Sequence, residues 1–123
     1  MKGIRGAAGV GSNTEEAILE ATSQLLVEIA QRNHLDPADV VSALFTLTPD
    51  LNAAFPAAAA RAVGWVDVPL MCAQEIPVPE ALPSIVRVLL LVERDDPVHH
   101  VYLGRARGLS PDLAGTRKGE ADK

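Results

Sequence analysis

The stretch SIVRVLLLVER, residues 84–94, is the longest candidate for a β-strand in the chain. Its many branched and aliphatic side chains favour extended structure. One charged residue, Arg87, interrupts the apolar run. A guanidinium group that is buried without a partner costs free energy. The stretch therefore predicts a strand of the core whose arginine needs a partner.

Helices and further strands are predicted on both sides of this stretch. A glycine-rich turn, GVGSN, leads into a helix with a capping box formed by Ser12 and Glu15, and apolar residues recur at helical spacing as far as Ile29. Asp36 predicts a capped turn. A second helix ends at Gly64. The other predicted strands cover residues 2–8, 40–48, 68–75 and 98–103.

The predicted order, β-α-β-α-β-β-β, indicates an α+β fold in which two main helices cover one face of a mixed β-sheet. The other face lacks a cover, so we expect it to be buried against copies of the same chain in a homo-oligomer. With 123 residues and 48% hydrophobic content, the chain suits one domain with an aliphatic core. We expect that domain to span residues 1–113 and the polar residues 114–123 to form a flexible tail.

Composition and charge exclude several classes of function. The net charge of −5 argues against nucleic acid as a partner. A lone cysteine, Cys72, cannot form an internal disulfide and favours the cytoplasm. The longest apolar run, residues 88–92, is far shorter than the ~20 residues that span a bilayer. His34 and the adjacent pair His99 and His100, which a strand would point to opposite faces, have no metal-ligand spacing, so no metal site is expected.

Polar residues in the predicted strands indicate either a salt bridge at a sheet edge or interface, or a converging site. Arg5 and Arg87 interrupt apolar strands, Glu75 ends one, and Tyr102 lies in the last. Guanidinium groups match carboxylates, so such a site would bind a small, carboxylate-rich ligand. It suits a reaction that needs positioning and electrostatic stabilisation, such as a unimolecular rearrangement. Cys72 is either a small core residue or a nucleophile, and the glycine-rich turn either binds an anion or simply turns.

Six segments resemble a known family: GIRGA, TPDLNAAFPA, VPLMCAQE, IVRV, HVYL and LSPDL, in this order, are similar to the AroH class of monofunctional chorismate mutases. The resemblance runs from about residue 3 to residue 113. It implies a homotrimer with a pseudo-α/β-barrel fold, active sites between subunits and no cofactor. It also implies an isomerase that converts chorismate to prephenate by a Claisen [3,3] rearrangement, on the shikimate-pathway branch of aromatic amino acid biosynthesis that leads to phenylalanine and tyrosine.

The same resemblance implies a role for individual residues. Arg87 resembles the catalytic arginine that faces the ether oxygen of the breaking bond, and Glu75 the carboxylate that accepts a hydrogen bond from the ring hydroxyl, with Cys72 beside it. Arg5 and Tyr102 resemble the residues that hold the substrate's carboxylates. The remaining implied substrate-binding residues are Phe55, Ala57, Leu70, Met71 and Leu109.

Two positions depart from the family pattern. Ala58 stands where a lysine is common, and Ser110 stands where an arginine is common. Both replacements remove positive charge that would face a dianionic substrate. They motivate an alternative hypothesis, a non-catalytic or regulatory module that binds small carboxylates on the same trimeric fold. A thiol enzyme that uses Cys72 is a third.

Overall fold

The computed structural model describes residues 1–109, and the predicted tail and the last residues of the predicted domain lie outside this part. The predicted order of helices and strands is confirmed. The described elements are strand β1 (Lys2–Gly9), helix α1 (Glu15–Asn33), the 3₁₀ helix η1 (Pro37–Asp39), strand β2 (Val40–Leu47), helix α2 (Ala57–Ala62), strands β3 (Leu70–Gln74), β4 (Ile85–Val92) and β5 (Val101–Leu103), and the 3₁₀ helix η2 (Gly104–Leu109).

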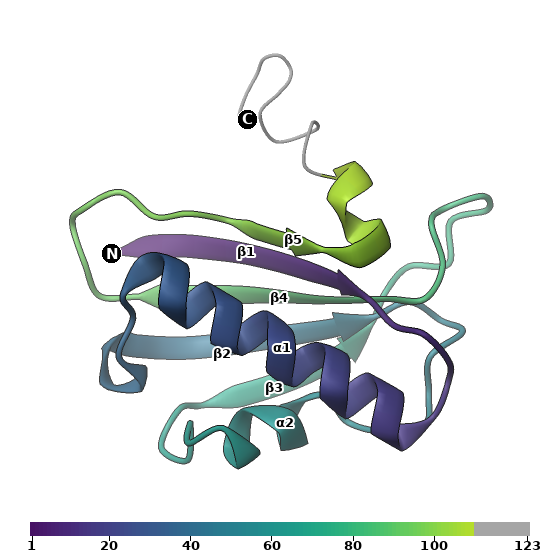
Figure 1. Cartoon of the computed structure of the whole chain (residues 1–123), viewed down its shortest axis with the longest axis horizontal. Helices are drawn as coiled ribbons and strands as arrows, with labels where there is room; N and C mark the ends of the chain where they lie inside the picture. Colours follow the sequence, from purple (N-terminus) through teal and green to yellow (C-terminus); the bar gives the residue numbers. More distant parts are fainter. Residues whose placement is uncertain (110–123) are drawn as a thin grey trace.

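The five described strands form one mixed sheet in the order β3-β2-β4-β1-β5 (Figure 1). Strand β4, from the stretch that opened the sequence analysis, lies at its centre and pairs antiparallel with both β1 and β2. Strand β3 runs parallel to β2, and β5 runs parallel to β1. Because β1 and β2 both run antiparallel to β4, they are parallel to each other. The connections from β1 to β2 and from β2 to β3 are therefore crossovers, and they contain α1 and α2 respectively.

Helices α1 and α2 both pack on one face of the sheet, as predicted (Figure 1). Side chains of β4 alternate between the two faces. Val88 and Leu90 are buried beneath the helices, whereas Leu89 and Leu91, on the opposite face, are 47% and 39% exposed. Apart from η2 near β1, no described element covers this opposite face, which we call the open face.

Close packing between α1 and β1 depends on Gly6. A Cβ atom at this position would lie 2.7 Å from Cδ1 of Ile29 and 3.1 Å from Cδ1 of Leu25, so the helix could not approach the strand as it does. Both of these residues are fully buried, as the predicted helical spacing required. No described helix is long and apolar enough to cross a membrane.

Two local predictions are wrong. Helix α1 is capped by Thr14 and not by Ser12, because Thr14 has the extended backbone and its Oγ1 accepts a hydrogen bond from the backbone N–H of Ala17. The last strand is shorter than predicted and excludes His99 and His100. Hydrogen bonds to side chains replace strand pairing there: the N–H of Arg5 donates to His100, and the N–H of His99 donates to Asn33. Strand geometry therefore does not place the two histidines on opposite faces.

Candidate active site

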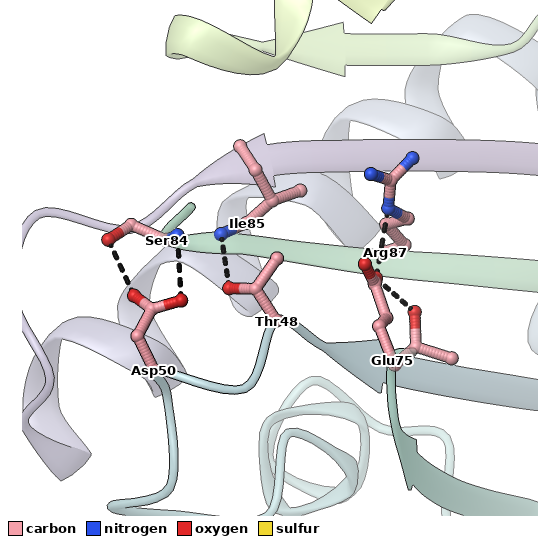
Figure 2. A network of polar contacts seen from close by, with 7 residues as sticks. Thr48, Asp50, Glu75, Ser84, Ile85 and Arg87 are labelled. Atoms are coloured by element: carbon pink, nitrogen blue, oxygen red, sulfur yellow. Dashed lines mark hydrogen bonds and ion pairs between the residues drawn. The ribbon is translucent and has the colours of Figure 1, made fainter. Parts of the chain in front are cut away.

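The arginine of the central strand finds its partner in Glu75. Arg87 Nε lies 2.9 Å from Glu75 Oε2, and Thr46 Oγ1 donates a second hydrogen bond of 2.7 Å to the same oxygen (Figure 2). Strand register explains the meeting, because Thr46 of β2 is the direct neighbour of Arg87 on β4. The backbone N–H of Glu75 bonds to Leu47 O at 2.9 Å and keeps the chain beside β2 just past the end of β3.

A pocket of about 260 Å³ opens beside this ion pair on the open face. Arg5, Arg87, Tyr102 and Leu109 all line it, together with Thr46 and several apolar side chains. Ala7 lies between Arg87 and Tyr102 in the sheet register, and its small side chain leaves room between them. The structure thus brings four of the predicted site residues together. We call this cavity the arginine pocket.

A second cavity of about 510 Å³ lies beside β3 and α2 and is lined by Phe55, Ala58, Cys72 and Gln74, among others. Phe55 is 76% exposed, so its ring lies open at this cavity. Glu15 is the one charged residue among those that line the cavity within the described part of the chain. We call it the Phe55 pocket.

The loop that carries Phe55 is held by the turn before α1. Asn13 Oδ1 accepts hydrogen bonds from the backbone N–H groups of Asn52 and Ala53, at 3.0 and 3.1 Å, and Asn13 Nδ2 donates to Asn52 Oδ1 at 2.9 Å. The glycine-rich turn of the sequence analysis therefore anchors a loop. Sequence reasoning missed this role of Asn13, since nothing in the sequence pairs residues about forty positions apart.

The two pockets lie on opposite sides of the sheet. Cys72 is the register neighbour of Phe45, which is fully buried beneath the helices, and it packs against that core. Thr46, the next residue of β2, points to the open face and lines the arginine pocket. Cys72 and Glu75 are three residues apart, and this odd spacing already implies opposite faces for an extended segment. That signal was present in the sequence.

The remaining predicted site residues lie outside both pockets. Leu70 and Met71 line a third hollow with Leu89 and Leu91, and Met71 is 67% exposed. Ala57 is buried in the core at the start of α2. Within one chain, therefore, the predicted residues do not converge on a single cavity.

A polar clip beside the site fixes the start of β4 (Figure 2). Asp50 accepts hydrogen bonds from the backbone N–H and the hydroxyl of Ser84, and Thr48 Oγ1 accepts one from the backbone N–H of Ile85. Burial acts to raise the pKa of the Asp50 carboxyl, but the hydrogen bonds from Thr48 and Ser84 outweigh it and hold the pKa below 3.8. The clip holds the strand that carries Arg87 in register with β2.

The donor set argues for binding an organic anion. Two guanidinium groups and a phenol line a largely apolar cavity. Among the described residues, no group of three or more His, Cys, Asp or Glu side chains could hold a metal ion. The fold and this cavity define a class: an α+β domain that presents an arginine-lined, anion-binding site on the open face of a mixed sheet.

Comparisons with known proteins identify the family. Residues 1–113 match the family chorismate mutase type I. The chain is 46% identical to chorismate mutase AroH of Bacillus subtilis (strain 168), over 98% of each chain, and 47% identical to chorismate mutase AroH of Thermus thermophilus, over 92% of this chain and 96% of that one. A solved chorismate mutase from Clostridium thermocellum superposes with a TM-score of 0.86 at 44% identity, over 88% of this chain and 99% of that one. The chain belongs to the type I, AroH-class chorismate mutases, which confirms the predicted resemblance.

Proposed function

We propose that the arginine pocket and the Phe55 pocket are the two halves of the site in which this chorismate mutase converts chorismate to prephenate. The rearrangement breaks one C–O bond and forms one C–C bond within a single molecule. It needs no nucleophile, base or cofactor. The observation that carries the proposal is the arginine pocket itself, because two guanidinium groups face one cavity of a size suited to a small dicarboxylate.

Arg87 stabilises the negative charge that develops on the ether oxygen. A cation at that oxygen binds the transition state more strongly than the substrate, which lowers the barrier. Arg87 uses Nε to contact Glu75, and its two terminal nitrogens point away from Glu75 (Figure 2). The ion pair thus orients the guanidinium without occupying the nitrogens that would meet the substrate.

Glu75 accepts a hydrogen bond from the ring hydroxyl of chorismate. Its side chain is 19% exposed, and its carboxylate is already oriented by Thr46 and Arg87. A side chain held before the substrate arrives loses less conformational entropy on binding. Thr46 therefore acts as a positioning residue for Glu75.

Arg5 and Tyr102 hold the substrate's carboxylates at the other end of the arginine pocket, and Leu109 contributes an apolar wall. Arg5 lies on β1 and Tyr102 on β5, which are adjacent strands. A bidentate contact from a guanidinium fixes both the position and the orientation of a carboxylate. Holding the substrate in a compact conformation brings the two carbon atoms that bond within reach of each other.

The Phe55 pocket belongs to a neighbouring copy of the chain. A sheet separates the two pockets of one subunit, so one substrate can touch both kinds only where two copies meet. Exposed apolar side chains on the open face, including Leu89 and Leu91, favour such contact. We infer a homotrimer with a site at each interface, in which Phe55 and Cys72 form the opposite wall. Ala57 at the start of α2, and Leu70 and Met71 on β3, lie next to these residues in the chain. We also infer that the enzyme acts in the cytoplasm.

Turnover tests this function directly. Purified protein is mixed with chorismate, the loss of the substrate's ultraviolet absorbance is followed, and prephenate is identified after acid conversion to phenylpyruvate. Enzyme-dependent prephenate formation is the expected result. Saturable binding of chorismate in calorimetry without conversion would instead support the non-catalytic binding module that Ala58 and Ser110 motivate.

A further inference from the structure

The edge of β1 beside Arg5 is completed by a side chain instead of a strand. β5 pairs with β1 only at Gly6, Ala7 and Ala8. At the next position the backbone N–H of Arg5 donates a hydrogen bond of 2.9 Å to Nδ1 of His100. The imidazole thus accepts the hydrogen bond that a backbone carbonyl of a neighbouring strand would otherwise accept. It does so at Arg5, whose side chain lines the arginine pocket.

The segment that carries His100 is fixed to α1. Asn33 Oδ1 accepts a hydrogen bond of 2.7 Å from the backbone N–H of His99, and Asn33 Nδ2 donates one of 2.9 Å to His99 O and another of 2.9 Å to Ile29 O. Asn33 is 3% exposed, so these bonds are shielded from water. This anchor leaves His100 little freedom to move away from Arg5.

We propose that His100 is a positioning residue for the reaction: its neutral imidazole holds the Arg5 backbone, and through it the guanidinium, in the arginine pocket. The inference rests on the proposed function, in which Arg5 binds a substrate carboxylate. His100 is not one of the described residues that line the pocket, so we place its effect at the backbone of Arg5.

Only a neutral imidazole can play this role, because Nδ1 accepts a hydrogen bond only when it carries no proton. Burial, the charge of Arg5 and then that of His99 lower the pKa of His100 below 6.5. α1 packs against this segment through the uncharged Asn33. At neutral pH the acceptor is therefore present. Protonation at lower pH would set an N–H against the N–H of Arg5 and add a cation near its guanidinium.

The stability of the folded state should depend on pH in the same direction as the hydrogen bond, because protonation of His100 favours the unfolded chain. A histidine whose pKa is lower in the folded state stabilises the fold above the unfolded value of 6.5. That stabilisation falls as the pH drops below 6.5 and is lost once the pH has passed the folded pKa. We therefore expect Arg5-dependent binding and stability to weaken over the same acidic range.

Kinetics of four proteins test the proposal: the wild type, His100→Asn, His100→Leu and the control His99→Asn. Asparagine places an oxygen close to the position of Nδ1 and does not titrate, whereas leucine offers no acceptor. His99 is exposed, and only its backbone contacts Asn33. KM and kcat are measured from about pH 8 to about pH 5, where an unperturbed histidine changes charge.

For the wild type, KM should rise as the pH falls through the pKa of His100. His100→Asn should keep KM within about threefold of the wild type near neutral pH and lose this dependence. His100→Leu should raise KM about tenfold at every pH, with a smaller change in kcat, as expected for one lost hydrogen bond that leaves its donor unpaired. His99→Asn should retain the acidic rise in KM, shifted to higher pH because His99 lowers the pKa of His100.

A wild-type KM in His100→Leu, or an unchanged acidic rise in KM in His100→Asn, would overturn the proposal. A protein that shows no turnover at all would instead contradict the proposed function, and a readout independent of activity then decides this inference. Nitrogen NMR of the wild type should show Nδ1 of His100 unprotonated near neutral pH, and the amide resonance of Arg5 should shift as His100 titrates. An Arg5 amide that does not respond would refute the hydrogen bond itself.

Discussion

The arginine pocket and the Phe55 pocket differ in charge, in side of the sheet and in what holds them. Guanidinium groups from β1 and β4 line the first, and strand register places them. The second is mainly apolar, and the carboxylate of Glu15 is the one charged group among its described lining residues. Hydrogen bonds from the side chain of Asn13 hold its loop in place. The difference suggests a division of labour, in which one half stabilises charge and the other shapes the cavity.

The largest effect is expected when the positive charge of Arg87 is removed from the arginine pocket. Arg87→Ala should lower kcat by about three orders of magnitude, because a preorganised donor at the developing charge is lost and Glu75 is left without its cation. Steady-state kinetics measure the effect, and analytical ultracentrifugation checks that the assembly is unchanged. Arg32→Ala is the matched control, since Arg32 pairs with Glu28 on the surface of α1. Near wild-type turnover of Arg87→Ala would refute the role of Arg87.

Mixed assemblies test whether the two halves come from different subunits. Phe55→Asp should lower kcat/KM about a hundredfold, because a carboxylate then repels the dianionic substrate. Coexpression of this variant with Arg87→Ala in equal amounts should restore about a quarter of the wild-type activity, because in randomly mixed trimers one interface in four receives two intact halves. If both halves came from the same chain, every site would carry one lesion and the mixture would stay inactive.

Adding a positive charge to the Phe55 pocket should strengthen substrate binding, whereas the two preceding substitutions weaken the reaction. Ala58 lines this pocket, and the resemblance given in the sequence analysis implies a lysine at this position. Ala58→Lys should lower KM for chorismate about fivefold with little change in kcat, as a partly exposed cation facing a dianion would. Ala81→Lys, in an exposed loop that lines neither pocket, is the control. An unchanged KM would mean that this part of the pocket does not face the substrate's carboxylates.

The smallest effect is expected at the thiol. Cys72→Ser should change kcat/KM by no more than about threefold, because a hydroxyl keeps a polar contact and the mechanism uses no nucleophile. The same continuous assay measures it. Loss of catalysis in the serine variant would favour the thiol enzyme. It would also mean that the Phe55 pocket takes part in the chemistry and does not only shape the cavity.

Much of the candidate site could be predicted because charge is costly inside an apolar strand. Arg87 and Arg5 stand out for this reason, and the resemblance added roles for Glu75 and Tyr102. Thr46 and His100 were missed. A threonine in an alternating strand and a histidine before a strand are common, and only their partners, Glu75 and the Arg5 backbone, reveal a task.

Element order, the aliphatic core and the family were determined by the sequence itself, because periodicity, turn residues and ordered motifs are local properties of the chain. Tertiary structure alone decided how those local pieces meet. Register places Thr46 beside Arg87. The odd spacing of Cys72 and Glu75 implied opposite faces, but only register shows that Cys72 lies on the helix side of the sheet and Glu75 on the open face. Such meetings depend on pairing between residues far apart in the chain, and pairing energy is shared across the whole sheet, so no single stretch of sequence carries it.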